Sequence, residues 1–212
     1  MKNFKNRLKY HEPGLAPVED ETGWYHIDKQ ENEIYPQRYQ RAFGYYDGLA
    51  AVTDFGGKCF HIDINGRRVY KENYTFCGNF QERKCVVRDF SNNYFHISTD
   101  GKRLYTKNFK YVGDFRDGFA CVMLSDGCFI HIDSNGNALN KEKFLDLGVF
   151  HKGFATAKDE NGWFHIDIQG NALYSERYLI AEPFYNGFAL VTDFGNNKMI
   201  INEKGEIVLC LG

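Results

Sequence analysis

The 212-residue sequence has few prolines, no paired cysteines and no long apolar run. It contains four prolines, and none of its six cysteines belongs to a CxxC pair, so nothing indicates a disulfide framework. No apolar run approaches the roughly 20 residues that a membrane-spanning helix needs. The basic start of the chain is followed by no apolar segment, which argues against a conventional signal peptide. We therefore expect a cytoplasmic protein that does not bind membranes.

The sequence also lacks an excess of one charge and the common catalytic motifs. Its 26 Lys and Arg residues nearly balance 28 Asp and Glu residues, for a net charge of −2. A general nucleic-acid binder normally shows a basic excess, so we expect no nucleic-acid partner. The GxSxG, P-loop, GxGxxG and HExxH motifs are absent. These absences favour a protein that is not an enzyme and needs no cofactor.

The nearest approach to a metal-binding pattern consists of Cys121, Cys128 and His131. Its spacing matches no standard zinc site, and Cys121 occupies a repeat position otherwise filled by Ala. We expect small buried thiols here and no metal ion.

What the sequence does contain is an unusual number of aromatic residues, 17% of the chain, in a regular repeat. Five histidines are separated by 35, 35, 35 and 34 residues, and most are followed by Ile and Asp. When the copies are aligned, each repeat position forms a column, and Ile200 occupies the histidine column in a sixth copy. A Gly-aromatic-Ala element and columns of Gly, Tyr and Phe recur with the same spacing. The histidines are His26, His61, His96, His131 and His165.

The repeats divide the chain into a short arm and one repeat domain. Residues 1–13 form a basic N-terminal arm that carries Lys2, Lys5, Arg7 and Lys9, for which we expect a flexible tether or a short helix. Residues 14–212 form a single domain of six units, which start near 14, 48, 83, 118, 153 and 187.

Each unit is typical of an antiparallel β-meander. Strand one is the Gly-Phe-Ala-x-Val element, and strand two is aromatic-His-Ile-Asp. Asn-Gly and Asp-Gly pairs, as in 135–136 and 100–101, indicate tight turns. A third strand would end on the Tyr column, and a short fourth strand could precede the next unit. No sustained 3.6-residue period indicates a helix.

The strands carry large apolar groups on both faces, so neighbouring units must cover each sheet. The sequence therefore predicts an all-β fold of six antiparallel meander repeats of about 35 residues. Small Gly and Ala in strand one favour a β-propeller-like arrangement. An open β-solenoid is the alternative, because a four-stranded propeller blade usually has about 40–45 residues.

These residues resemble the bacterial WG (or KWG) repeat. The similarity rests on Trp-aromatic-His-Ile-Asp-x-x-Gly, a tyrosine, and then Asp-Phe-x-x-Gly-Phe-Ala-x-Val, and it covers residues 14–212. Trp survives only at Trp24 and Trp163, and Arg83-Lys84 displaces the Gly-Phe pair of the third unit. The His-Ile-Asp version resembles a subgroup whose arrays often lie beside a catalytic domain, methyltransferases among them. The resemblance identifies no catalytic residue.

The candidate binding residues follow from the repeat and from its exceptions. The five histidines could form a ring or ladder with the following Asp, although a repeated packing position with hydrogen bonds to a neighbouring turn is the favoured interpretation. The Asp column is expected to cap Asx-type turns, and the aromatic columns to form the core. Trp24 and Trp163 are candidates for stacking on a ligand. Arg83 and Lys84, with Arg88 nearby, form a basic patch.

Two kinds of function remain open at this point. The leading hypothesis is a non-catalytic repeat module that binds a protein partner or an adjacent catalytic domain, such as a methyltransferase. The alternative is a module that binds a carbohydrate or another small ligand through exposed aromatics and the His/Asp column.

Overall fold

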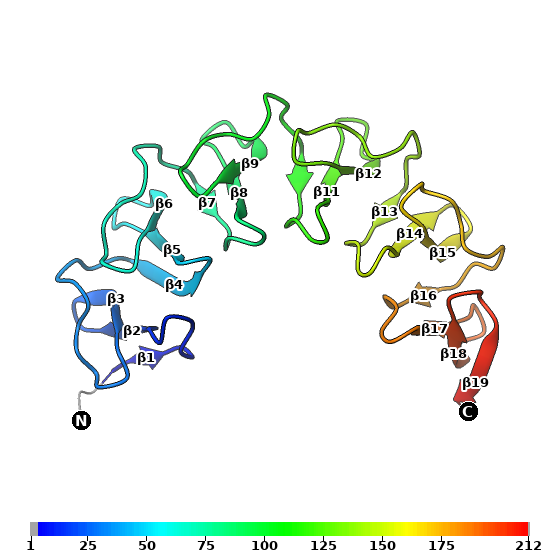
Figure 1. Ribbon diagram of the computed structural model, residues 1–212, viewed down its shortest axis with the longest axis horizontal. Coiled ribbons are helices and arrows are strands. Elements are labelled where there is room, and N and C mark those ends of the chain that lie inside the picture. The colour runs from blue at the N-terminus through cyan, green and yellow to red at the C-terminus, as the bar shows by residue number, and fades with distance from the viewer. Residues whose placement is uncertain (1–3, 212) are drawn as a thin grey trace. The chain divides into compact units, whose positions relative to one another are not determined.

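The computed structural model describes residues 4–211. Over this range the chain forms six antiparallel sheets and no helix, and hence no helix that could cross a membrane. The chain divides into two compact units, with the division between Asn108 and Phe109. Each unit holds three successive sheets (Figure 1). The expectation of an all-β fold built from six antiparallel meanders is therefore confirmed.

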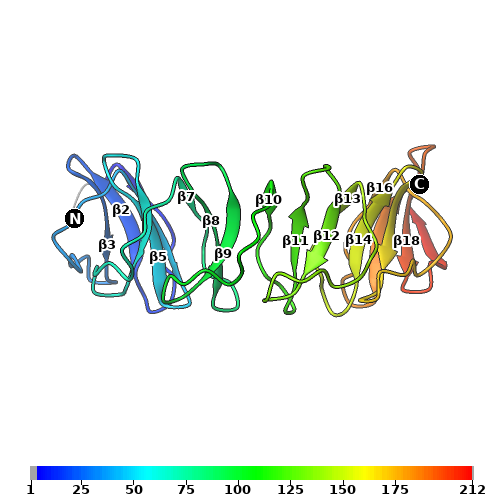
Figure 2. The same ribbon diagram turned by 90° about the horizontal axis from the view of Figure 1, so that it is seen from above.

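The first unit contains the sheets β1-β2-β3, β4-β5-β6 and β7-β8-β9. Within this unit the strands stand side by side and run roughly along one direction (Figure 2). Their bounds are β1 Asn6–Arg7, β2 Ala16–Asp20, β3 Gly23–Ile27, β4 Arg41–Tyr46, β5 Leu49–Thr53, β6 Cys59–Ile62, β7 Phe76–Cys77, β8 Lys84–Arg88 and β9 Tyr94–Ser98.

The second unit contains the sheets β10-β11-β12, β13-β14-β15 and β16-β17-β18-β19. Their bounds are β10 Tyr111–Val112, β11 Ala120–Met123, β12 Phe129–Ile132, β13 Asp146–Leu147, β14 Ala155–Asp159, β15 Gly162–Ile166, β16 Ile180–Ala181, β17 Phe188–Thr192, β18 Lys198–Asn202 and β19 Ile207–Leu211.

Each sheet joins the end of one sequence repeat to the start of the next. The Gly-Phe-Ala-x-Val strand lies in the middle, and the His-Ile strand pairs with it in antiparallel register, for example Thr156 opposite His165. The short strand expected at the end of each repeat is present. It pairs with the first strand of the next repeat and so belongs to the next sheet, as β13 pairs with β14. The two are joined by a tight turn with two left-handed residues, such as Asp117 and Gly118 at φ 51° and 83°. Such turns match the twist of a hairpin.

The N-terminal residues belong to the first sheet, so the expected tether or helix is wrong for the described part of the arm. Asn6–Arg7 form β1, which pairs with β2. Tyr10 then donates a hydrogen bond to the carbonyl of Asp28, as Tyr45 does to that of Asp63. Tyr10 and Tyr45 are one repeat length apart, so the arm is the short first strand of a repeat. Lys2 lies outside the described residues.

The expected third strand is wrong for most repeats. After β15 the chain returns beside it, but it pairs only at isolated positions, Ile166 with Ala172 and Trp163 with Tyr178. Between these positions the chain departs from regular pairing, because Tyr174 turns inward to reach His165. The last repeat is different. Ile200 and Leu209 occupy the His and Tyr columns and lie opposite each other, and β19 pairs with β18 as a regular strand apart from one bulge.

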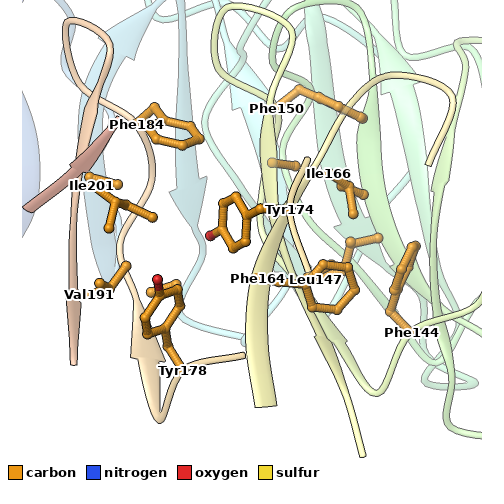
Figure 3. Close-up of a cluster of buried hydrophobic side chains, with 14 of the residues drawn as sticks. Phe144, Leu147, Phe150, Phe164, Ile166, Tyr174, Tyr178, Phe184, Val191 and Ile201 are labelled. Atoms are coloured by element: carbon orange, nitrogen blue, oxygen red, sulfur yellow. The ribbon is translucent and has the colours of Figure 1, made fainter. Parts of the chain in front are cut away.

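The aromatic columns form the core, as expected. In the second unit, one cluster of buried side chains spans the junctions between successive sheets. Figure 3 shows Tyr174 and Tyr178 between Phe164 on one side and Val191 on the other. Burial of aromatic rings between successive sheets of the unit adds apolar area that helps to stabilise sheets with such short strands.

Candidate functional site

The repeated histidine is buried at the junction between one sheet and the next. His165 lies on β15 and is fully buried. Its Nδ1 lies 2.5 Å from the hydroxyl of Tyr174, and its Nε2 lies 2.8 Å from the carbonyl oxygen of Glu182, just after β16 of the following sheet. The ring of Phe184 covers the imidazole, with ring centroids 4.0 Å apart. One histidine therefore connects two sheets and the segment between them.

The two hydrogen bonds determine which nitrogen of the imidazole carries the proton. A carbonyl oxygen can only accept, so Nε2 of His165 donates to Glu182. Burial lowers the pKa of His165 to about 4, which keeps the ring neutral near pH 7. Nδ1 is then an acceptor, and the Tyr174 hydroxyl donates to it. Burial also raises the pKa of Tyr174, so this hydroxyl keeps its proton.

The first unit repeats this arrangement. His26 pairs through Nδ1 with the Tyr35 hydroxyl and through Nε2 with the carbonyl of Phe43. His61 does so with Tyr70 and the carbonyl of Gly78. His96 is also buried, and its Nδ1 lies 2.5 Å from the hydroxyl of Tyr105. For His26 and His61 the partners are thus a tyrosine nine residues on and a carbonyl of the next sheet, rather than the Asp or turn that the sequence suggested. No ligand can reach these histidines in this structure.

His131 departs from the pattern. It is 3% exposed, and its Nε2 donates to the carbonyl of Gly148 at 2.8 Å. The residue nine positions on is Asn140, where the other four histidine-bearing repeats have tyrosine. As a result, His131 Nδ1 has no hydrogen-bond partner among the described residues. A buried acceptor without a donor is uncommon and costs free energy.

Two further positions of this fourth repeat differ from the fifth. In the fifth repeat the Arg177 guanidinium stacks on the Phe164 ring at 3.6 Å and bonds the Asp159 carboxylate. In the fourth repeat Ile130 and Lys143 take these two places. Lys143 pairs instead with Asp126 near the surface, and Ile130 remains partly exposed. The fourth repeat thus lacks the hydroxyl, the aromatic ring and the stacked cation together.

The other candidate residues belong to different sheets. Trp24 is buried, and the Arg41 guanidinium lies 4.2 Å above its ring. Trp163 is partly buried beside Lys158. Arg83 is exposed in a tight turn with φ 61°, at a repeat position usually filled by Gly, and its amide donates to Asp47. Lys84 is partly exposed at the start of β8. The two tryptophans are therefore not an exposed stacking surface.

The Asp column caps turns as expected. Asp63, for example, accepts hydrogen bonds through Oδ1 from the amides of Asn65 and Arg67, the geometry of an Asx-type turn. Among the cysteines, four are buried, Cys128 is partly buried and Cys210 is exposed. The Cys121 thiol donates to the Leu147 carbonyl. Residues 4–211 bring no three metal-binding side chains together.

Two open grooves lie at equivalent junctions in the first unit. One, of about 570 Å³, is lined by residues that include Tyr35, Tyr39, Phe60 and Arg68, and the other, of about 530 Å³, by Tyr74, Phe95 and Arg103 among others. In each the guanidinium stacks on the phenylalanine, at 4.1 and 3.9 Å. Both arginines also donate to carbonyl oxygens of their own loops.

In each unit, exposed apolar side chains that the repeat motifs did not indicate recur at one end of the sheets. The turn between the middle strand and the His strand carries an Asp-Phe pair in three repeats. Phe55, Phe90 and Phe194 in these pairs are 66%, 63% and 61% exposed. The short first strands add exposed residues beside this turn, since Phe76 lies opposite Arg88. We call this set the apolar edge: Phe55, Phe76 and Phe90 in the first unit, and Tyr111, Leu179, Ile180 and Phe194 in the second.

The recurrence of Asp-Phe at one turn was the signal that could have identified the apolar edge from sequence. Strand sequences alternate between buried faces, and turns are normally polar, so a repeated phenylalanine in a turn is unexpected. Phe55 and Phe194 also approach Gly23 and Gly162 of the neighbouring repeat, where an added Cβ would lie 2.9 Å from the ring tip. These phenylalanines are therefore positioned by contact and still largely exposed.

Comparison with known proteins supports the relation to WG repeats and the fold. The model of the WG containing repeat family matches residues 27–59 and 97–128. No curated protein matches the chain in sequence. Among solved structures, the chain is similar to the computationally designed Ika8 protein, with a TM-score of 0.57, 10% identity, and 96% of this chain and 72% of the other covered.

Two natural proteins show the same likeness. BamB from Moraxella catarrhalis gives a TM-score of 0.54 at 13% identity, with 96% of this chain and 75% of BamB covered. The C-terminal WD40 domain of Sif2 gives 0.51 at 10% identity, with 95% and 67% covered. WD40 domains are β-propellers. At these identities the likeness concerns the fold alone, so the chain has a β-propeller-like repeat fold, and two of its segments match the WG containing repeat.

Proposed function

We propose that this chain is a non-catalytic WG-repeat module that binds a protein partner through its apolar edge. The observation that supports this is the exposure of Phe55 and Phe90 at equivalent turns of successive sheets in one unit. Rows of exposed large apolar side chains on a folded domain are typical of interaction surfaces, and aromatic residues supply much of the energy at such surfaces. A rigid repeat array presents them at fixed spacing.

The partner in this proposal is either a separate protein or a catalytic domain next to the repeats, such as a methyltransferase. The module would act in the cytoplasm of a bacterial cell, where six free thiols stay reduced. Carbohydrate binding through the tryptophans and the histidine column is less well supported, because Trp24 and the five histidines are buried.

The test is a capture experiment with matched variants. Phe55→Ser combined with Phe90→Ser removes the apolar edge of the first unit. Ile64→Ser is the control, because Ile64 is 43% exposed but lies in the turn after β6, at the other end of that strand. The protein would be cross-linked in its native host and recovered with its partners for mass spectrometry.

We expect one protein to be recovered with the wild type and with Ile64→Ser and to be lost with the double variant. Thermal unfolding checks that the wild type and both variants are folded. Equal recovery with all three would contradict the role of the apolar edge. Recovery of no specific protein by the wild type would contradict the interaction proposal as a whole.

A further inference from the structure

The fourth repeat keeps the backbone that accommodates a tyrosine but lacks the tyrosine. The amide of Leu139 donates to the His131 carbonyl at 2.9 Å, as that of Leu173 does to the His165 carbonyl at 3.0 Å. Phe144 pairs with Phe129 as Tyr178 pairs with Trp163. The segment around Asn140 therefore follows the same path as the segment around Tyr174, although the side chain at the central position differs.

The Asn140 side chain fills only the inner part of the tyrosine position. In the fifth repeat, Cβ and Cγ of Tyr174 lie over Gly205, and the rest of the ring continues to His165. In the fourth repeat the amide group of Asn140 lies over Gly170 in the same way. Asn140 Oδ1 accepts from the amide of Glu142. No tyrosine hydroxyl reaches His131 Nδ1, which is buried without a hydrogen-bond partner among residues 4–211.

We propose that this place, the His131 socket, binds a 4-substituted phenol whose hydroxyl donates to His131 Nδ1. The socket is defined by His131, Asn140, Phe144 and Ile130, which correspond to His165, Tyr174, Tyr178 and Phe164 of the complete repeat. The missing chemical group is known, since four other repeats place a phenol against the same imidazole nitrogen. The site is separate from the apolar edge and does not depend on it.

The chemistry of the socket favours a neutral donor with an aromatic body. His131 Nδ1 is a lone-pair acceptor because Nε2 donates to Gly148 and burial lowers the pKa of His131 to about 4. Phe144 and Ile130 are apolar and Asn140 is neutral, so a charged ammonium group would lose its hydration and find no counter-charge among these side chains. A metal ion would need further ligands, and the described residues hold no group of three metal-binding side chains. A phenol supplies the donor that this enclosed acceptor lacks, and its ring takes the place of the tyrosine ring of the other repeats.

The phenol has two sources, a free small molecule or the tyrosine side chain of a partner. Both present the same group to His131, and experiment separates them. The probes are p-cresol for the free molecule and N-acetyl-tyrosinamide for a tyrosine side chain. Toluene is the control, because it has the ring and methyl group of p-cresol and lacks the hydroxyl.

The first measurement is binding to the wild-type chain by ligand-observed NMR, with the ¹⁵N shift of His131 Nδ1 as the readout of the hydrogen bond. We expect p-cresol to bind about tenfold more tightly than toluene and to shift the Nδ1 signal, since one hydrogen bond to a buried acceptor is worth about that factor. Binding of N-acetyl-tyrosinamide as well would indicate a partner tyrosine. Binding of p-cresol alone would indicate a free small molecule.

Matched variants locate the site. Asn140→Tyr and Asn140→Phe fill the socket from within, and both should abolish p-cresol binding. Tyr174→Asn should create a second socket against His165 and double the number of bound p-cresol molecules. The proposal is overturned if p-cresol does not bind the wild type at millimolar concentration, if it binds no better than toluene, or if Asn140→Tyr binds it equally. Circular dichroism of each variant confirms that it is folded.

Discussion

The fourth and fifth repeats each have a buried histidine at the same repeat position, but the two histidines have different hydrogen-bond partners. His131 and His165 both donate through Nε2 to a carbonyl of the next sheet at 2.8 Å, and both stack on a phenylalanine, Phe150 or Phe184. Only His165 receives a tyrosine hydroxyl. The sheet junction of the fourth repeat nevertheless has the same backbone pairing. The carbonyl bond and the aromatic contact therefore join the sheets, and the tyrosine is a separable addition.

The largest effect should come from protonating both histidines. Burial lowers the pKa values of His131 and His165 to about 4, below the usual value near 6.5. The folded state thus binds fewer protons than the unfolded state, so stability is fully present above pH 6.5 and is lost as the pH falls toward 4. Each histidine contributes up to about 3 kcal/mol to this loss. Because His26 and His61 behave alike, we expect unfolding before pH 4 is reached.

Urea unfolding at a series of pH values measures this effect. Although burial opposes it, hydrogen bonds from Asn137 and Asn135 lower the pKa of Asp133, a carboxylate of an Asx-type turn. The stability that such carboxylates contribute is lost mainly below about pH 5, so the change between pH 7 and pH 5 reports the histidines. A free energy of unfolding that stays constant from pH 7 to pH 5 would contradict the assignment of neutral, buried histidines.

The second effect follows from converting the fifth repeat into a copy of the fourth. Tyr174→Asn removes a buried ring and the hydroxyl that His165 accepts. Loss of a buried aromatic side chain typically costs about 3–4 kcal/mol. We expect a loss of this size in urea unfolding, partly restored by saturating p-cresol. An unchanged stability would mean that the tyrosine contributes nothing to the junction.

Much of this comparison could be predicted from the sequence, because the repeat length is regular. The columns of histidine and tyrosine predicted buried, repeated positions, and the Asp-x-x-Gly pattern predicted the turns. The bond from tyrosine to histidine was not predicted, because strand alternation describes regular pairing and the segment around Tyr174 is irregular. The absence of tyrosine at Asn140 was visible in the sequence, but its meaning depends on that bond. The first strand, Asn6–Arg7, was not predicted. Its signal in the sequence is Tyr10, which precedes Tyr45 by one repeat length.

The third effect separates the hydroxyl from the ring. Tyr174→Phe keeps the ring and leaves His165 Nδ1 without its donor, which gives the fifth repeat the unpaired acceptor of the fourth. An unpaired buried acceptor costs about 1–3 kcal/mol, so we expect a loss of about 2 kcal/mol. Tyr178→Phe is the matched control, because Tyr178 lies in the same cluster (Figure 3). Among residues 4–211, the structure shows no hydrogen bond of the Tyr178 hydroxyl. Equal losses for the two variants would remove the special role of the His165 bond.

The smallest effect is the reverse change, which completes the fourth repeat. Asn140→Tyr places a ring beside Phe144 and a hydroxyl donor at His131 Nδ1, on a backbone that already follows the path used around Tyr174. The gain is one hydrogen bond and some buried apolar area, offset by the loss of the Asn140 bond to the Glu142 amide, so we expect about 1 kcal/mol of added stability. Urea unfolding of the wild type, Asn140→Tyr and Asn140→Phe isolates the hydroxyl, because only the first of the two variants supplies a donor. A stabilisation shared equally by both variants would show that the ring alone matters. A loss of stability in both would show that the fourth repeat has adapted its core to asparagine, and that its likeness to the fifth is confined to the backbone.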